Sequence, residues 1–410
     1  MEMTPNIIEQ NAFASVLFER MKELNPGLQD LELYEFRYGL NNLLSSEDWS
    51  SVSLDKAEEI EKRVNDRAFY DRIQIKSKVD DRIVLDEKIL HLTRMLLVGL
   101  ATGDYSVEWV GRHFYFDIRG FYFLHRTTYF TESIRAHFGG KPFRQFEQKQ
   151  RIFDSCQEIG YKAFKDVNAP VDRLFIESVK ELFDARGTPI LIAIAGPTGA
   201  GKTEIVEQLH ASFEWEGRRM ASIEMDNFLT DRDEREAKGI FTLGKEALHF
   251  DLLKQGLEDI THGKKIAIPR YDFVFATSSH DGNGNLKPGG VPIEIEPADI
   301  IFIEGNFPFL FNEIARLISI KVVYLTDDPV RLKRKWWRDI DLRKKYEPTY
   351  FRNRFFKDQF IMAEVAYRPQ LEVCDLCVDT TGAALWVTPE IAGILTQREK
   401  SQTLIGSGSS

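Results

Sequence analysis

The stretch ILIAIAGPTGAGKT, residues 190–203, decides the fold of the second half of this chain. Its first six residues are apolar, as expected of a strand that is buried on both faces of a parallel sheet. The rest matches the spacing G-x-x-x-x-G-K-[ST], and a helical pattern follows over 204–213. Backbone N–H groups of such a loop, with the helix N-terminus, converge on phosphate oxygens. We therefore predict a nucleotide-binding P-loop whose residues are Gly196, Pro197, Thr198, Gly199, Ala200, Gly201, Lys202 and Thr203.

Further apolar runs follow this motif and alternate with helical segments. The runs that predict strands are 220–225, 300–303, 321–325 and 373–378. Alternation of this kind is typical of a parallel sheet wrapped by helices. We predict an α/β fold, with a P-loop NTPase-type parallel sheet and flanking helices, preceded by an α+β N-terminal domain. The predicted domains are 1–183, of unknown role, and 184–400, the P-loop domain, followed by a flexible tail at 401–410.

The N-terminal region mixes helical patterns with an aromatic stretch. Residues 11–24, 86–100 and 171–183 have helical periodicity, whereas 108–123 alternates with period two and predicts a hairpin that turns near Gly120. An aromatic stripe of this kind favours an interface. We expect a packing domain through which copies of the chain form a homo-oligomer, and effector binding is the alternative.

Composition excludes several classes of protein. The 410 residues carry 54 basic and 64 acidic side chains, a net charge of −10, so we expect no nucleic acid as partner. No apolar run reaches the roughly 20 residues that span a bilayer, so we expect no membrane association and a cytoplasmic protein. The three cysteines, Cys156, Cys374 and Cys377, make no disulfide framework, and the C-x-x-C pair lacks a second ligand pair for zinc.

Two acidic residues follow predicted strands. Asp226 comes after the strand at 220–225, and Glu304 after the strand at 300–303. The carboxyl edge of a parallel sheet is where α/β proteins place their sites. There, Asp226 is suited to accept a proton from a hydroxyl or to bind metal, and Glu304 to bind Mg²⁺. The alternatives are a turn or helix-capping role for Asp226 and a solvated strand end for Glu304.

A basic segment lies downstream of these strands. Residues 331–345, RLKRKWWRDIDLRKK, contain eight Lys or Arg in fifteen positions on a predicted helix. Arginines in a lid that closes over a nucleotide stabilise charge on the transferred phosphoryl group. A solvated basic face is the alternative, since most charge runs are solvated.

From about residue 190 to 380 the chain resembles the phosphoribulokinase and uridine kinase family. The resemblance rests on motifs that occur in the family's order. These are GPTGAGKT (196–203), MDNF (225–228), HFDLL (249–253), IPRYDF (268–273), EPADIIFIEG (296–305), DDPVRL (327–332) and RKWWRD (334–339).

The resemblance implies an ATP- and Mg²⁺-dependent metabolite kinase and assigns roles to residues of this chain. The implied catalytic residues are Asp226, as the general base, with Lys202, Arg334 and Arg338 facing the phosphates. The implied metal ligands are Thr203, Glu304 and Asp226. The implied substrate-binding residues are Tyr271, Arg270 and His249.

Departures from the family pattern concern the acceptor. Uridine kinases carry a His and an Arg shortly after Tyr-Asp-Phe, whereas Ala276 and Ser278 stand at those positions here. The family's His-Pro-Asp pattern before His249 is also missing. Because recognition through hydrogen bonds fails when the partners are absent, we expect a different hydroxylated acceptor: a sugar, sugar phosphate, polyol or hydroxy acid. A uridine or cytidine kinase and an ATP-binding sensor without turnover are the alternatives.

The turn-rich stretch 278–290 is predicted to be a mobile hairpin tip between the segments 270–276 and 291–295. A flap of this kind would exclude water during phosphoryl transfer.

Overall fold

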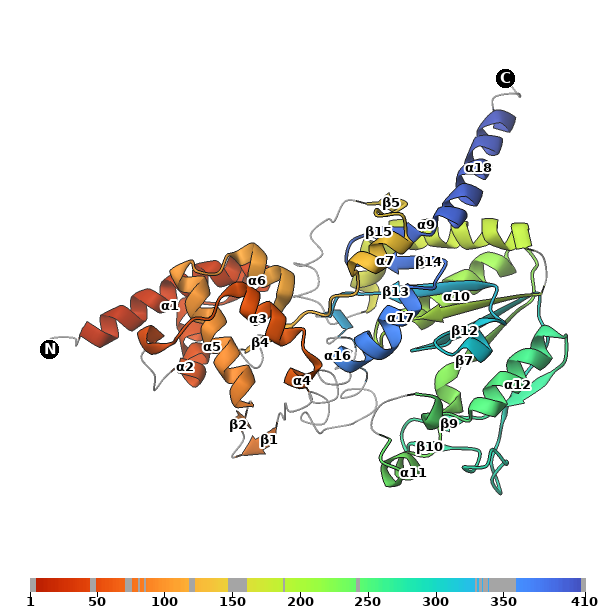
Figure 1. Cartoon of the computed structure of the whole chain (residues 1–410), viewed down its shortest axis with the longest axis horizontal. Helices are drawn as coiled ribbons and strands as arrows, with labels where there is room; N and C mark the ends of the chain where they lie inside the picture. The colour runs from red at the N-terminus through yellow and green to blue at the C-terminus, as the bar shows by residue number, and fades with distance from the viewer. Residues whose placement is uncertain are drawn as a thin grey trace. The chain divides into compact units, whose positions relative to one another are not determined.

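The protein is described here by a computed structural model, whose elements are labelled in Figure 1. The described residues are 5–44, 49–70, 76–79, 82–84, 86–117, 122–146, 161–186, 189–240, 244–328, 330–331, 334, 338 and 359–406. The chain divides into two compact units. The first consists of Met1–Thr128, Gln150–Phe164 and Asp328–Ile361, and the second of Tyr129–Lys149, Lys165–Asp327 and Met362–Ser410. The second unit therefore includes residues that precede the boundary predicted at 183.

The first unit is mainly helical and contains two antiparallel hairpins. Its elements are α1 (Pro5–Leu24), η1 (Pro26–Asp30), α2 (Leu33–Leu44), η2 (Trp49–Ser51), α3 (Ala57–Val64), α4 (Arg67–Tyr70), β1 (Lys76–Val79), β2 (Arg82–Val84), α5 (Glu87–Thr102), α6 (Val107–His113), β3 (Phe114–Asp117) and β4 (Tyr122–His125). One core joins α1, α2, α3, α5, α6 and the β3–β4 hairpin. Helix α5 is packed almost all round, because it buries residues on every side from Leu92 to Leu100.

The predicted aromatic hairpin is confirmed only in its second half. Strands β3 and β4 pair as expected, but residues 107–113 form α6 instead of a strand. Local capping explains the difference, since the Ser106 side chain accepts a hydrogen bond from the backbone N–H of Trp109. The turn predicted near Gly120 lies outside the described residues.

The second unit is an α/β layer structure. Its helices are α7 (Glu132–His137), α9 (Tyr161–Arg186), α10 (Lys202–Glu214), η3 (Met225–Phe228), α11 (Arg232–Ala237), η4 (Lys245–Ala247), α12 (Phe250–Thr261), α13 (Asn312–Ala315), the π-helical turn η7 (Ala363–Tyr367), α17 (Arg368–Leu371) and α18 (Pro389–Gly406). Helix α16 (Gln359–Met362) spans the division between the two units after Ile361. Its strands are β5 (Arg144–Gln145), β6 (Ile190–Ala195), β7 (Met220–Glu224), β8 (Ile266–Ile268), β9 (Tyr271–Asp272), β10 (Thr277–Ser278), β11 (Ile293–Ile295), β12 (Ile300–Gly305), β13 (Ile320–Leu325), β14 (Leu376–Asp379) and β15 (Ala384–Val387). Helix α18 extends into the segment predicted to be a flexible tail.

The main sheet has seven strands in the order β5-β15-β14-β13-β6-β12-β7. Its five strands from β14 to β7 are parallel, and they are the five strands predicted from the apolar runs. The last of them begins at Leu376 and not at Val373, which is 53% exposed in the turn after α17. Strands β15 and β5 add antiparallel pairs at one edge and were not predicted.

Helices cover both faces of this sheet, as Figure 1 shows for α9, α10 and α12. Alternate strand residues point to opposite faces. One face packs against α9, α10 and α18, and the other against α7, α12 and the η7–α17 segment. This double covering explains why the strands are almost continuously apolar.

Strand pairing brings the predicted chemical groups to one edge. Because β12 lies between β6 and β7, the P-loop, the end of β12 and the turn η3 all follow neighbouring parallel strands. The segment 266–295 leaves the sheet as two short antiparallel pairs, β8 with β11 and β9 with β10. A bridge between His280 and Leu286 lies within the predicted tip. The flanking pairs differ from the prediction, because 293–295 pairs with 266–268 and 271–272 pairs with 277–278.

No helix among the described residues is long and apolar enough to cross a membrane. Cys374 and Cys377 are buried free thiols, and burial raises the pKa of both well above the usual range. Cys156 lies outside the described residues.

Candidate active site

The loop between β6 and α10 depends on its glycines. Gly199 and Gly201 have φ of 76° and 106°, in the left-handed region that side chains disfavour. A Cβ on Gly196 would lie 2.2 Å from the backbone oxygen of Tyr324, so only glycine allows β13 and the loop to approach this closely. The first turn of α10 begins at Lys202, directly after the last glycine. Because the backbone N–H groups of a helix's first turn have no acceptor within the helix, this end of α10 is suited to an anion.

Hydrogen bonds hold the loop in shape. The Lys202 ammonium donates to the carbonyl oxygens of Gly196 and Pro197, at 2.8 and 3.2 Å. The Thr326 hydroxyl, just after β13, donates to the Ala200 carbonyl at 2.6 Å. The lysine therefore spans the loop interior, where phosphate oxygens would replace the two carbonyls as its acceptors.

Glu304 is the best-defined acidic group of the site. It is 8% exposed at the end of β12, which excludes the solvated alternative. The Thr203 hydroxyl donates to its Oε1 at 2.9 Å, whereas its Oε2 is buried without a hydrogen-bond partner among the described residues. Burial raises the pKa of Glu304 to about 7, and the nearby Lys202 charge only partly opposes this shift. A buried carboxylate with one oxygen that accepts no hydrogen bond is well suited to bind a cation.

Two more carboxylates follow β7. Asp226 is half-buried inside the turn η3, so it is not the residue that caps this turn. Glu224 is opposite Glu304 in the register of β7 and β12. Partial burial of its carboxylate, and then the charge of Asp226, raise the pKa of Glu224. Both Glu224 and Asp226 raise the pKa of Glu304. The three groups therefore share one electrostatic environment, of which the sequence analysis identified two members.

These residues fit Mg²⁺ bound together with a nucleotide. Mg²⁺ prefers oxygen ligands and usually keeps waters and substrate phosphates in its shell. The Thr203 hydroxyl and Glu304 Oε2 offer such oxygens next to the phosphate-binding loop. Within the described ranges no three Asp, Glu, His or Cys side chains converge on one point, so the protein alone does not form a complete cage.

Tyr271, predicted to bind substrate, lies next to the acidic turn. Its backbone N–H donates to Asn227 Oδ1 at 3.2 Å, and Asn227 directly follows Asp226. Its ring is 6% exposed, and its hydroxyl accepts a hydrogen bond from Arg235 Nη2 at 3.1 Å. The β9 segment is therefore attached to the end of β7 by one buried amide and to α11 by one buried guanidinium.

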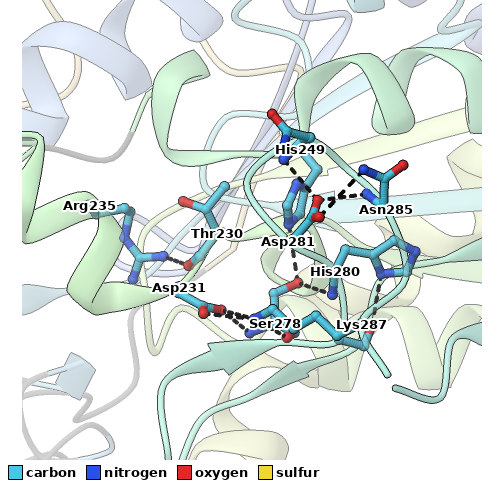
Figure 2. Close-up of polar contacts among 11 residues, drawn as sticks. Thr230, Asp231, Arg235, His249, Ser278, His280, Asp281, Asn285 and Lys287 are labelled. Atoms are coloured by element: carbon cyan, nitrogen blue, oxygen red, sulfur yellow. Dashed lines mark hydrogen bonds and ion pairs between the residues drawn. The ribbon is translucent and has the colours of Figure 1, made fainter. Parts of the chain in front are cut away.

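His249, also predicted to bind substrate, belongs to a buried polar network (Figure 2). Its Nε2 lies 3.2 Å from Ser278 Oγ, and its ring centroid lies 6.1 Å from that of His280. Burial lowers the pKa of both histidines, so both are neutral near pH 7. Asp231 closes the network, because it accepts from the Ser278 backbone N–H at 2.7 Å and pairs with Lys287 at 2.7 Å.

The remaining predicted site residues lie outside these networks. The Arg270 side chain is exposed, and only its backbone joins the hairpin, through Ser279. Arg334 and Arg338 are half-buried, and most of the basic segment around them lies outside the described residues. Their role in a lid stays a prediction.

Sequence reasoning missed Glu224, Asn227, Asp231, Arg235 and Lys287. Glu224 carried a usable signal, because it is a carboxylate at the carboxyl end of the predicted strand 220–225, two positions before the candidate Asp226. The others come together through contacts between distant segments, such as the one between Asp231 and Lys287.

The part of the chain that carries this site is similar to known proteins. The model of the phosphoribulokinase / uridine kinase family matches residues 191–381. A uridine kinase from Brevibacillus brevis is 34% identical over 160 residues, which cover 38% of this chain and 69% of the relative. A uridine kinase from Lactobacillus helveticus is 32% identical over 159 residues, which cover 38% of this chain and 70% of the relative. A solved phosphoribulokinase from Rhodobacter spheroides is 18% identical, with a TM-score of 0.34 over 47% of this chain and 70% of its own.

Kinases of this kind use ATP with Mg²⁺, the two groups that the P-loop and the Thr203–Glu304 pair fit. The matches to these two relatives cover more than two thirds of the relatives' length. The segment that the family model matches includes the loop, Asp226 and Glu304. This chain therefore belongs to the phosphoribulokinase / uridine kinase family.

Proposed function

We propose that this protein transfers the γ-phosphoryl group of Mg²⁺-ATP to a hydroxyl of a small metabolite. The observation that carries the proposal is the bond between Thr203 and the buried Glu304, beside Asp226 and at the edge of the P-loop. A protein that only senses ATP has no use for a base next to the phosphates, whereas a kinase needs one.

Each group of the site has a distinct task in this reaction. Mg²⁺ and ATP supply the activated phosphoryl group and neutralise its charge. The loop N–H groups and Lys202 bind the phosphates and fix their direction, and Thr203 with Glu304 would hold the metal. Asp226 accepts the proton of the acceptor hydroxyl as the hydroxyl oxygen bonds to the γ-phosphorus. The bond from that phosphorus to the β–γ bridging oxygen breaks, and ADP leaves. Positioning and charge provide most of the rate enhancement, as is usual in phosphoryl transfer.

Uridine or cytidine is the acceptor class that the relatives favour. The two most similar relatives described above are named uridine kinases, and the matched segment contains the acceptor hairpin as well as the P-loop. In this candidate, Tyr271 and His249 border the nucleoside and Asp226 faces the ribose hydroxyl.

A sugar, sugar phosphate, polyol or hydroxy acid is the second candidate, and a specific observation favours it. Ala276, where uridine kinases carry a histidine, is 4% exposed and has no polar group. Ser278, where they carry an arginine, is buried and already bonded to His249 and Asp231. Neither position offers a hydrogen bond to a base, so selectivity for uridine would have to come from other residues.

The test is ADP release by purified full-length protein with Mg²⁺-ATP and a panel of acceptors. The panel contains uridine, cytidine, pentoses, their phosphates, polyols and hydroxy acids. Asp226→Asn is assayed in parallel, and Asp233→Asn, an exposed aspartate of α11, is the matched control. We expect one acceptor class to stimulate release in the wild type and the control only. ATP binding without stimulation by any acceptor would contradict the kinase proposal and favour the sensor.

A further inference from the structure

Arg235 is a buried cation that the phosphoryl-transfer machinery does not use. It is 7% exposed, although it lies on the short, highly charged helix α11. Its Nη1 donates to the Thr230 carbonyl and its Nη2 to the Tyr271 hydroxyl. The guanidinium also lies 5.7 Å from the centroid of the Tyr271 ring. All of these partners are neutral.

No acidic partner balances this charge within the part of the chain that the structure describes. The acidic residues within four positions of Arg235 are Asp231, Asp233, Glu234 and Glu236. Asp231 pairs with Lys287 and Glu234 with Lys238, and Asp233 and Glu236 are exposed. A guanidinium has five N–H donors and cannot lose its proton in a protein. The two hydrogen bonds to Thr230 and Tyr271 use two of these five donors, so the guanidinium has further N–H groups that can bind an acceptor.

Burying a charge without a counter-charge is costly, so proteins seldom keep one unless a partner arrives. The neutral contacts to Thr230 and Tyr271 orient the guanidinium but do not neutralise it. Arg235 is thus a preorganised cation whose missing partner is an anion. The planar fork matches a phosphate or carboxylate, with which it forms two parallel charge-assisted bonds.

The position of Arg235 indicates which anion reaches it. Arg235 contacts Tyr271, Tyr271 is bonded to Asn227, and Asn227 follows the proposed base Asp226. This chain of contacts runs along the acceptor side of the site, whereas the P-loop phosphates lie at the end of β6. In Figure 2 the Arg235 side chain extends toward Thr230, apart from the Asp231–Lys287 pair.

We propose that Arg235 binds a negatively charged group of the acceptor, so that the substrate is an anionic hydroxy compound, either a phosphate ester or a carboxylate. This inference rests on the proposed kinase function and adds the charge of the acceptor to it. A neutral acceptor leaves the buried guanidinium unpaired, and the resulting loss of binding energy discriminates against neutral analogues.

The first test measures anion binding without turnover. The P-loop of the full-length protein is filled with Mg²⁺ and a non-hydrolysable ATP analogue, and inorganic phosphate or acetate is then titrated by calorimetry. We compare the wild type with Arg235→Gln and with Arg219→Gln, a matched control whose arginine is 72% exposed and pairs with Asp299. Preference for phosphate over acetate would identify the phosphate ester, and the reverse preference the carboxylate.

We expect one anion to bind to the wild type and the control, and its affinity to fall roughly tenfold to a hundredfold in Arg235→Gln, as for other hydrogen bonds to charged groups. Equal affinity in all three proteins, or no anion binding by the wild type, would overturn the proposal. Binding of the ATP analogue to Arg235→Gln shows that the variant is folded.

The second test compares matched acceptors in the ADP-release assay: a pentose with its phosphate, and a polyol with the corresponding hydroxy acid. We expect the charged member to have the higher kcat/KM in the wild type, and Arg235→Lys, which keeps the charge but loses the fork, to raise KM more than it lowers kcat. Efficient turnover of uridine or another neutral acceptor would refute the role of Arg235 and leave the kinase proposal intact. Failure of every acceptor would refute the kinase proposal instead.

Discussion

Replacing Glu304 by glutamine should change stability and metal binding in opposite directions. The amide oxygen of glutamine can keep the hydrogen bond from Thr203, because Oε1 only accepts there. The negative charge disappears, and with it the group that would bind Mg²⁺. In the metal-free protein, however, this charge destabilises the fold, since burial raises the pKa of Glu304 from 4.5 to about 7.

The size and sign of the effect follow from this shift. A carboxyl whose pKa is higher in the folded state favours its protonated form, so its penalty is absent below pH 4.5 and complete above about pH 7. At about 1.4 kcal/mol for each pKa unit, the charged form costs the fold roughly 3 kcal/mol at pH 8. In the glutamine variant an amide N–H replaces Oε2. This buried donor has no partner, so it lowers the stability by about 1 to 2 kcal/mol and cancels part of the gain.

Glu304→Gln should therefore be more stable than the wild type by about 1 to 2 kcal/mol at pH 8, and less stable at pH 4.5, in the absence of metal. Urea unfolding at both pH values with a chelator present measures this difference, and Glu246→Gln, on an exposed glutamate, is the control. The variant should also lose the stabilisation that Mg²⁺-ADP gives the wild type. A variant less stable than the wild type at both pH values would refute this account of the carboxylate.

Three further predictions concern the base, the loop and the first unit. Asp226→Asn should lower kcat by about 10² to 10⁴ without weakening ATP binding, as measured by ADP release and by calorimetry. Gly196→Ala should weaken ATP binding strongly in the same calorimetric assay, because its Cβ would lie 2.2 Å from the Tyr324 oxygen. Tyr105→Phe should cost about 1 kcal/mol in urea unfolding, because the hydroxyl donates to the Asp55 carbonyl. Burial raises the pKa of Tyr105 to about 12, so this contribution should persist up to pH 10 and be lost as the pH rises toward 12.

The parallel sheet could be predicted because its sequence signal is strong and local. The parallel strands inside the sheet are covered on both faces, so they appear as short apolar runs, and ILIAIA at β6 matches the observed strand residue for residue. Strand β7, at the edge, alternates buried and exposed residues. Strand β15 (ALWV) also carries an apolar run, which the sequence analysis did not assign to a strand, whereas β5 carries none. The two residues of β5 are exposed and are defined only by their pairing with β15, far along the chain.

The acceptor side of the site could be predicted only in part. Tyr271 and His249 were found through a family resemblance, which transfers only where motifs match. Arg235 gave no signal, because its helix reads RDEREA and predicts a solvated surface. Its burial depends on the β9–β10 hairpin, which brings Tyr271 across 36 positions of the sequence. Contacts of this length follow from the tertiary fold and not from local periodicity.

Glu304 and Arg235, two charged side chains of the second unit, share one property: each is buried without a bonded partner of opposite charge among the described residues. Glu304 keeps one carboxylate oxygen without a partner, and Arg235 has no acidic partner within the described ranges. Both are buried, and both destabilise the fold until a charge of opposite sign arrives. They cannot satisfy each other, because Glu304 is bonded to the P-loop helix through Thr203 and Arg235 to the acceptor hairpin through Tyr271. Mg²⁺ would therefore neutralise the charge of Glu304, and an anionic acceptor the charge of Arg235. The penalty that each charge imposes on the free protein would then add to the favourable free energy of binding.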